Sequence, residues 1–184
     1  MFVEGDRRMI RKANVQDIPK ITAIFDQLHT EEELGHSTTG WLRGIYPTED
    51  VAAAGVRAGD MIVVEEDGEV CAAARINQEQ CEEYAQITWE FEAREEQVLV
   101  LHTLVVSPQT QGRGCARQIL AHYEQEARDR NCTALRIDTN FRNQRARAMY
   151  RKYGYRESGV VDCDFNGIPN VQMVCLEKRV KNTF

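Results

Sequence analysis

The stretch Gln111-Gly-Arg-Gly-Cys-Ala116 decides the fold, because it places two glycines between an apolar strand and an amphipathic helix. The preceding run, Val98-Leu-Val-Leu-His-Thr-Leu-Val-Val106, is nearly all apolar, which is typical of a strand covered on both faces. After the turn, apolar residues recur at helical spacing through residues 116–127. The start of a helix exposes unpaired backbone N–H groups and a partial positive charge. The turn therefore predicts an anion-binding site.

The spacing of this turn excludes two common phosphate-binding motifs. A P-loop requires G-x-x-x-x-G-K-[ST] and a dinucleotide-binding turn requires G-x-G-x-x-G, and the turn matches neither pattern. Gly112 and Gly114 let the backbone come close to a ligand. Arg113 and Arg117 add positive charge at the rim, unless they are ordinary solvated arginines. From the turn alone, a glycine-rich connection with no ligand remains the alternative.

The other elements follow from periodicity and turn residues. Asp67-Gly68 predicts a tight hairpin turn, Asn166-Gly167 separates the last two strands, and Gly154 is placed to end a helix. The expected strands are residues 9–13, 61–65, 69–76, 98–106, 134–139, 155–165 and 171–179. The expected helices are residues 18–28, 47–57, 116–127 and 143–153.

Composition favours an ordinary globular protein. The 184 residues, of which 42% are hydrophobic and 28% charged, predict a single domain spanning 1–184. No apolar run is long enough for a membrane span and the first residues lack a signal-peptide core, so we expect a cytoplasmic protein without membrane contact. The six cysteines show no metal-binding spacing, which predicts no metal. A net charge of −6 disfavours nucleic acid as a partner.

Two ordered motifs together resemble the GNAT superfamily of acyl-CoA N-acyltransferases. Gln111-Gly-Arg-Gly-Cys-Ala116 is similar to the family's Q/R-x-x-G-x-G/A turn. Asn143-Gln-Arg-Ala-Arg-Ala-Met-Tyr-Arg-Lys-Tyr-Gly-Tyr155 is similar to its N-x-x-A-x-x-x-Y-x-x-x-G-F/Y helix. The element order from residue 9 to residue 179 fits as well. The resemblance implies an α/β fold of the α+β type, with a mixed, mostly antiparallel sheet of about seven strands, flanking helices and a splay at the fourth strand.

The resemblance also implies acetyl-CoA as the acyl-donor cosubstrate, with no metal. The pyrophosphate is expected on the turn, and the pantetheine arm beside the backbone of the splayed strand. Asn143 is expected to reach that arm, although a helix N-cap would also explain it. The implied binding residues are Leu104, Val105, Val106, Gln111, Gly112, Arg113, Gly114, Cys115, Ala116, Arg117, Asn143 and Ala146. Cys115 replaces a commonly aliphatic residue and is interpreted as a small core residue. A homodimer is compatible with the resemblance, because the last two strands often mediate dimers in this superfamily.

Two side chains are candidates for the chemistry of amine acetylation. His102 lies in an otherwise apolar strand, and the run Leu101 to Val106 is similar to the serotonin N-acetyltransferase-like branch, in which a His there deprotonates the amine. Tyr150 matches the family position whose phenol protonates the departing thiolate. The alternatives are a hydrogen-bonded core histidine and a packing tyrosine.

The sequence thus predicts an N-acetyltransferase that transfers acetyl directly to a primary amine, with His102 as general base and Tyr150 as general acid. A non-catalytic acyl-CoA-binding module and another nucleotide-binding α/β protein are the alternatives. The acceptor carries no motif; it is expected to meet residues 34–46, 78–97 and 162–170. Aromatic residues that could line its pocket are Trp41, Tyr46, Trp89 and Phe165. Acidic clusters that would suit a cationic acceptor are residues 31–33, 82–83, and 90 with 92.

Overall fold

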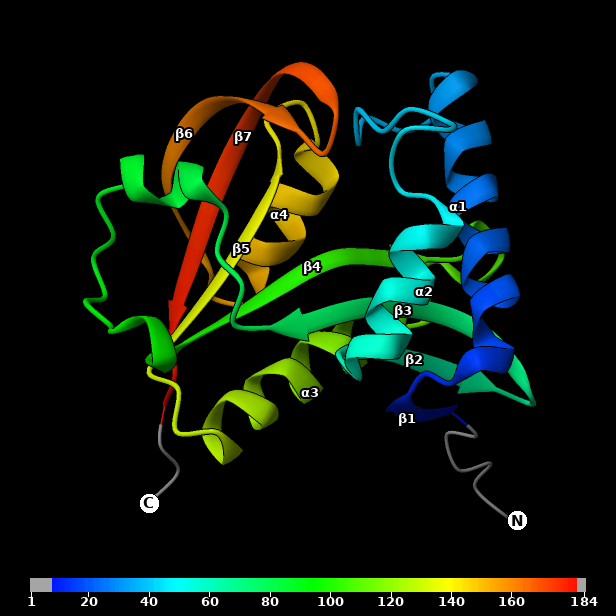
Figure 1. The fold of residues 1–184 in the computed structure, drawn as a ribbon, viewed down its shortest axis with the longest axis horizontal. Helices are drawn as coiled ribbons and strands as arrows, with labels where there is room; N and C mark the ends of the chain where they lie inside the picture. The colour runs from blue at the N-terminus through cyan, green and yellow to red at the C-terminus, as the bar shows by residue number, and fades with distance from the viewer. Residues whose placement is uncertain (1–7, 182–184) are drawn as a thin grey trace.

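The computed structural model describes residues 8–181, which form a seven-stranded sheet with helices on both faces (Figure 1). The strands are β1 (Arg8–Lys12), β2 (Met61–Glu66), β3 (Glu69–Asn77), β4 (Val98–Val106), β5 (Ala134–Asn140), β6 (Arg156–Phe165) and β7 (Ile168–Arg179). The helices are α1 (Ile18–Glu33), α2 (Glu49–Ala58), α3 (Cys115–Asp129) and α4 (Gln144–Lys152). Short 3₁₀ helices are η1 (Val15–Asp17), η2 (Glu82–Gln86), η3 (Glu95–Gln97) and η4 (Pro108–Thr110).

The sheet is mixed and mostly antiparallel, as predicted. Its strand order is β1-β2-β3-β4-β5-β7-β6. Only β4 and β5 run parallel; every other neighbouring pair is antiparallel. The chain passes from β4 to β5 through α3, because two parallel strands need a crossover connection, whereas two antiparallel strands can be joined by a short hairpin turn.

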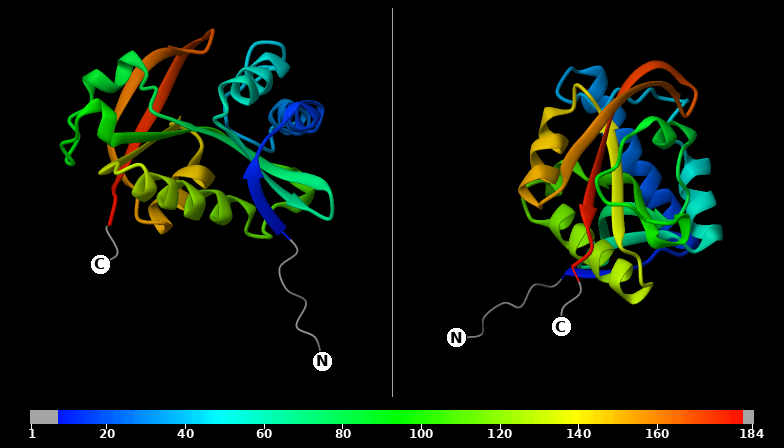
Figure 2. Two further views of the ribbon diagram at one scale, coloured as in Figure 1. Left: turned by 60° about the horizontal axis from the view of Figure 1, so that its bottom comes forward. Right: turned by 90° about the vertical axis from the view of Figure 1, so that its left-hand side faces the viewer.

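Helices cover both faces of the sheet (Figure 2), and a hydrophobic cluster lies beneath them on each face. On one face, Phe25 of α1 packs in a cluster with Val63 of β2. On the other face, Ile119 of α3 and Tyr150 of α4 pack in a cluster with Val64. Adjacent residues of β2 therefore enter different cores, since successive side chains of a strand point to opposite faces.

Turns with an aspartate or asparagine followed by a glycine form the two hairpins. Asp67 and Gly68 have φ angles of 52° and 84°, which confirms the predicted tight turn. Asn166 and Gly167 have φ angles of 48° and 86° between β6 and β7. This turn lets β7 pair from Ile168 onward, three residues before the predicted start at 171.

The sheet splits between β4 and β5. Their pairing covers only Val98 to Leu101 on β4, although β4 continues to Val106. A bulge opposite β3 begins at this point, where Thr103 has a φ of 50°, a strained value for a β-branched residue. Because bulges bend the strand that carries them, β4 turns away from β5. The expected splay at the fourth strand is confirmed.

Two loops, one after α1 and one after β3, are held by hydrogen bonds to carboxylates of α1 and β7. Glu32 of α1 accepts from the backbone N–H groups of Thr39 and Gly40 at 2.8 and 3.1 Å. Glu177 of β7, fully buried, accepts from the backbone N–H groups of Glu90 and Phe91 at 2.8 and 3.2 Å. The segment that follows α1 is thereby tied to α1, and the segment that follows β3 is tied to β7. Among residues 8–181, no helix is long and apolar enough to cross a bilayer.

Candidate functional site

A groove between β4, α3 and α4, called here the α3–α4 groove, has a volume of about 540 Å³. The predicted turn forms one wall and the start of α4 forms another. The predicted binding residues that line it are Leu104, Val105, Val106, Gln111, Gly112, Gly114, Cys115, Ala116, Arg117, Asn143 and Ala146. The predicted set therefore comes together in one place, with Arg113 as the exception.

The turn presents backbone rather than side chains to the groove. Gly112 and Gly114 have φ angles of 81° and 87°, which glycine adopts without strain. Gly114 is the N-cap of α3 and supplies no side-chain cap. The N–H groups of Cys115, Ala116 and Arg117 therefore have no acceptor among the described residues. This is the arrangement that an anion fills, because both the free donors and the helix dipole favour negative charge.

Two arginines around the turn have different partners. The Arg113 guanidinium pairs with Glu66 at 3.3 Å, on the side of β2, and its backbone carbonyl accepts from Arg8. The Arg145 guanidinium of α4 donates to the Gln111 side-chain oxygen at 2.8 Å. Arg145 thus links the two sequence motifs across the groove, a contact that the motifs themselves do not predict.

Asn143 caps α4, as the simpler interpretation of the sequence holds. Its Oδ1 accepts from the backbone N–H of Ala146 at 3.1 Å. Cys115 is only 1% exposed and packs in the core, as interpreted from the sequence. That core also holds Cys71, which interacts with Cys115, so Cys115 contributes volume to the base of the turn.

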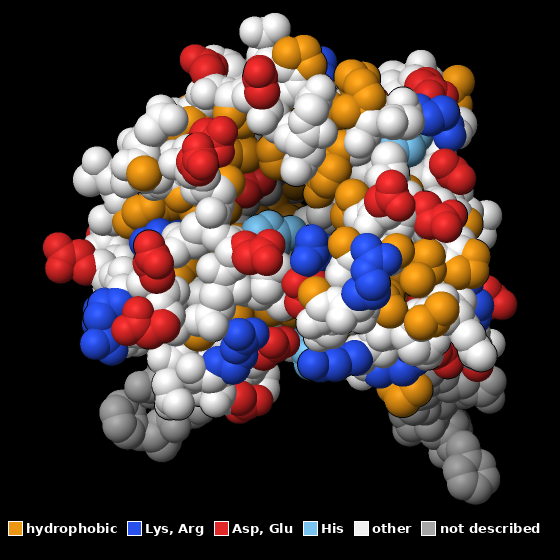
Figure 3. Space-filling model, viewed as in Figure 1, with side chains coloured by type: hydrophobic (Ala, Val, Ile, Leu, Met, Phe, Trp, Pro, Cys, Tyr) orange, Lys and Arg blue, Asp and Glu red, His pale blue; other side chains and the backbone are white. Residues whose placement is uncertain are grey.

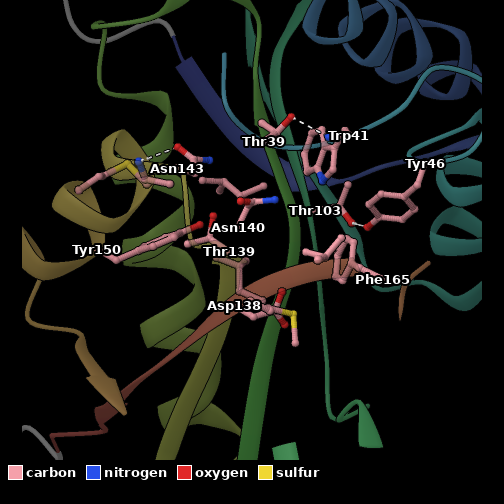
Figure 4. Close-up of a pocket in the computed structure, with 16 residues that line it drawn as sticks. Thr39, Trp41, Tyr46, Thr103, Asp138, Thr139, Asn140, Asn143, Tyr150 and Phe165 are labelled. Atoms are coloured by element: carbon pink, nitrogen blue, oxygen red, sulfur yellow. Dashed lines mark hydrogen bonds between the residues drawn. The ribbon is translucent and has the colours of Figure 1, made fainter. Parts of the chain in front are cut away.

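A smaller cavity of about 110 Å³, the junction cavity, lies where β4 and β5 separate (Figure 4). Leu104, Asn143 and Met149 line both this cavity and the groove. Figure 4 shows Tyr150 reaching into it from α4 and Asp138 bordering it from β5. The split therefore lets side chains from both faces of the sheet meet.

Tyr150 has an enclosed ring and a free hydroxyl. The residue is 5% exposed, and its ring makes an edge contact with Tyr155 at 5.9 Å between centroids. No other described residue hydrogen-bonds to the Tyr150 hydroxyl. Burial raises the pKa of Tyr150 above its usual value, so the phenol stays protonated at neutral pH. It can donate a proton into the junction cavity.

A third cavity, the rim cavity, has a volume of about 670 Å³ and opens on the other face. It is lined from all three segments expected to meet an acceptor, for example by Ile45, Glu83 and Phe165. Figure 3 shows this face hollowed at its centre, with hydrophobic and acidic side chains around the hollow. Trp89 does not line the rim cavity, because its ring packs against the Arg136 guanidinium at 4.0 Å.

Of the predicted aromatic residues, Tyr46 and Phe165 line both the junction and rim cavities, and Trp41 lines the junction cavity. Of the predicted acidic clusters, only Glu83 lines the rim cavity. Glu32 is instead one of the carboxylates that hold the loops. Within residues 8–181, no group of three or more His, Cys, Asp or Glu side chains is arranged to hold a metal ion.

His102 lines the rim cavity and is held in one tautomer. The Asn77 amide is oriented by two bonds, because its Oδ1 accepts from the Glu79 N–H at 3.0 Å and its Nδ2 donates to Asp60 at 2.8 Å. The His102 Nε2 lies 2.8 Å from that Oδ1, so in the neutral ring Nε2 carries the proton and Nδ1 the lone pair. Burial, with the Arg75 guanidinium, lowers the pKa of His102 to about 4.

Asp138 is a site residue that sequence reasoning missed. It is the first residue of β5 beyond the part paired with β4, and it lines both the junction and rim cavities. Its Oδ2 accepts from the Tyr84 hydroxyl at 2.7 Å. Burial raises the pKa of Asp138 to about 6. A lone aspartate after the apolar Ile137 carries no motif, so only the position of the split reveals it.

The family model described as acetyltransferase (GNAT) family matches residues 23–155. The matched range contains the turn, the split and α4. No curated protein sequence matches the chain.

Solved structures show the same fold at low sequence identity. A GNAT-family acetyltransferase from Streptococcus agalactiae has a TM-score of 0.79 at 22% identity, covering 96% of each chain. A structure from Salmonella typhimurium, determined with its cofactor acetyl-CoA, has a TM-score of 0.67 at 17% identity, covering 97% of this chain and 96% of that one. The ribosomal-protein-S18-alanine N-acetyltransferase from Escherichia coli has a TM-score of 0.67 at 14% identity, covering 96% of each.

Proposed function

The chain belongs to the acetyltransferase (GNAT) family, and we propose that it transfers acetyl from acetyl-CoA directly to a primary amine. The observation that carries this proposal is the adjacency of three spaces. The junction cavity shares lining residues with the α3–α4 groove and with the rim cavity, so it lies between them at the split. A donor and an acceptor can therefore approach from opposite faces of the sheet and meet at the split.

The donor belongs in the α3–α4 groove. Its pyrophosphate would lie on the free N–H groups at the start of α3, with Arg117 and Lys152 at the rim to add positive charge. Its pantetheine arm would pair with the backbone of Leu104 to Val106, as an added strand does on an open edge. This edge is available because β5 leaves β4 after Leu101. The neighbour with bound acetyl-CoA supports this choice of cosubstrate.

The reaction requires a polarised thioester carbonyl, a neutral amine and a protonated leaving group. Backbone N–H groups along the open edge of β4 can polarise the carbonyl. Tyr150 donates a proton to the thiolate, and its raised pKa keeps that proton in place until the sulfur departs. His102 is the base that takes a proton from the amine nitrogen, directly or through a water, because the pKa of about 4 keeps its ring neutral.

The acceptor belongs in the rim cavity. Glu79, Glu83, Asp138 and Asp164 line it, whereas its one arginine among the described lining residues, Arg75, is held by Asp60 at 2.9 and 2.7 Å. The local charge favours an amine that arrives as a cation. Aromatic walls supplied by Tyr46 and Phe165 suit the apolar part of such an amine.

Two experiments test this proposal. In calorimetry, acetyl-CoA should bind, while ATP and NAD should not; selective binding of either nucleotide would point to a different α/β protein. In a thiol-release assay with acetyl-CoA, a panel of ethylamine, putrescine and a lysine-containing peptide should include an amine that accelerates release. Tight acetyl-CoA binding with no amine-dependent release would instead indicate a non-catalytic acyl-CoA-binding module.

A further inference from the structure

A primary amine that arrives as an ammonium must lose two protons to become an amide, and the proposed function assigns only one acceptor. The first proton must leave before the nitrogen can attack, and the second leaves after the C–N bond has formed. His102, with a pKa of about 4, is poorly matched to an alkylammonium, whose pKa is roughly 10. A second proton acceptor is therefore needed on the same side of the split.

The geometry points to Asp138 as the group that takes the first proton from the incoming ammonium, with Tyr84 as its positioning residue; this role rests on the proposed function. Asp138 and His102 are each the first residue of their strand beyond the paired part, since the register ends at Leu101 opposite Ile137. Both line the rim cavity, but of the two only Asp138 also lines the junction cavity. Asp138 therefore stands where the two substrates meet.

The Asp138 carboxyl has one oxygen occupied and one available. Tyr84, which is 3% exposed, donates to Oδ2 and fixes the plane of the carboxyl, so Oδ1 remains for an ammonium. Figure 4 shows Asp138 at the lower edge of the lined space, below Thr139 and Phe165. The Tyr84 ring is itself held by an edge contact with Trp89 at 5.2 Å. The Asp138 carboxyl is thus oriented by a hydrogen bond from a tyrosine that packing holds in place, and not by a charged partner.

No cation compensates Asp138 among the described residues. The groups that interact with it electrostatically are phenols, thiols and one carboxylate: Tyr46, Cys81, Glu83, Tyr84, Tyr150, Cys163 and Cys175. Burial raises the pKa of each of these phenols and thiols, so they are neutral at pH 7. A cationic substrate would supply the missing charge. The pKa of about 6 also lies closer to that of an alkylammonium than the pKa of His102 does.

The proton count balances with these groups. One N–H bond of the ammonium breaks and its proton moves to Asp138 Oδ1, from which it passes to solvent. The freed lone pair forms the C–N bond, and the tetrahedral intermediate loses its second nitrogen proton to His102 as the C–S bond breaks. Tyr150 protonates the sulfur and is then reprotonated by the proton that His102 holds. The net products are the amide, CoA thiol and one proton in solution.

The test compares Asp138→Asn with wild type on two acceptors. One is the panel alkylamine with the highest kcat/KM, and the other is its counterpart fluorinated beside the amino carbon, which is already neutral at the assay pH. The variant should lose roughly 100-fold or more in kcat/KM with the alkylamine and little with the fluorinated amine. Equal losses with both amines would overturn the assignment.

Glu79→Gln is the matched control, because it removes a carboxylate from the wall of the same cavity. It should lower kcat/KM for the alkylamine only a few-fold, through the weaker attraction of the cavity for a cation; a loss as large as that of Asp138→Asn would mean that cavity charge, rather than Asp138, carries the effect. If wild type transfers acetyl to no amine, the proposed function fails and this role fails with it. Transfer by wild type with amine-independent losses in Asp138→Asn refutes the role of Asp138 alone.

Tyr84→Phe supplies a second readout that does not depend on the Asn variant folding. The Tyr84 hydrogen bond lowers the pKa of Asp138, so its removal should raise that pKa. The acidic limb of the plot of kcat against pH should therefore move to higher pH, while the Kd of acetyl-CoA measured by calorimetry stays unchanged. A limb that stays in place would contradict the positioning role.

Discussion

The α3–α4 groove and the rim cavity face each other across the same split but are held together differently. The groove is built mainly from two continuous stretches, 104–117 and 143–153, and it presents mostly backbone and helix ends. The rim cavity combines segments far apart in sequence, and two of these are tied down by Glu32 and Glu177. Cofactor binding should thus depend on local backbone conformation, and acceptor binding on long-range hydrogen bonds. A substitution should therefore be able to impair one half of the site alone, either the cofactor half (the α3–α4 groove) or the acceptor half (the rim cavity).

The largest effect on folding is expected from Glu177→Gln. The buried carboxylate accepts from Glu90 N, Phe91 N and, at 2.7 Å, the Ser158 hydroxyl. Loss of one oxygen and of the charge should cost about 2–3 kcal/mol in the free energy of unfolding. KM for the amine should rise while the Kd of acetyl-CoA stays constant. Denaturant titration would measure the free energy of unfolding, calorimetry the Kd of acetyl-CoA, and steady-state kinetics the KM for the amine.

Glu126→Gln is the control, because Glu126 pairs with Arg130 on the partly exposed side of α3 at 3.1 Å. Such a pair contributes less than about 1 kcal/mol to the free energy of unfolding, so Glu126→Gln should lower stability by less than that. If Glu177→Gln weakened acetyl-CoA binding as strongly as amine binding, the two halves would not be separable.

Gly114→Val should break the other half. With a φ of 87°, this N-cap position strains a β-branched residue by about 2 kcal/mol, and relief of that strain would turn the first N–H groups of α3 away. The Kd of acetyl-CoA should rise roughly 30-fold, the equivalent of about 2 kcal/mol. Calorimetry would measure it. Gly59→Val carries comparable strain at the end of α2, with a φ of 71°, and should lower stability without changing that Kd.

This difference between the halves also explains what the sequence could predict. The turn and α4 were predictable because glycine spacing and helical periodicity act within about ten residues of chain, and the structure brings their residues together. Asp138 could not be predicted as a site residue, because it lines the cavities only where β4 separates from β5. That point of separation depends on the bulge at Thr103. The low pKa of His102 likewise depends on burial in the folded chain and, after that, on Arg75, which is remote in sequence.

Asp138→Asn should raise stability at high pH. The folded-state pKa of about 6 lies above the ordinary aspartate value of 3.8, so the folded protein binds more protons than the unfolded chain between these two pH values and loses stability as pH rises through that window. The variant should be more stable than wild type by about 2–3 kcal/mol at pH 8 and equally stable below pH 4. Denaturant titrations at both pH values would measure the gap. A constant gap would show that the carboxyl is not destabilised by burial.

The smallest effect is expected from Arg145→Ala. Its hydrogen bond to Gln111 joins the two cofactor motifs, and the exposed guanidinium adds charge at the mouth of the groove. The Kd of acetyl-CoA should rise about 5-fold, roughly 1 kcal/mol, and less at high salt. Arg151→Ala is the control, because Arg151 pairs with Glu157 at 3.0 Å and does not line the groove. Equal effects of the two variants would reduce the role of Arg145 to net charge.

The central claim is that a donor and an acceptor meet at the split between β4 and β5, where Tyr150 protonates the sulfur. The most direct test is amine-dependent thiol release from acetyl-CoA by wild type and Tyr150→Phe, with Tyr153→Phe as control, because Tyr153 lines the groove but not the junction cavity. We predict that kcat falls roughly 100-fold in Tyr150→Phe, while the Kd of acetyl-CoA and the activity of Tyr153→Phe change little. Undiminished kcat in Tyr150→Phe would contradict the account.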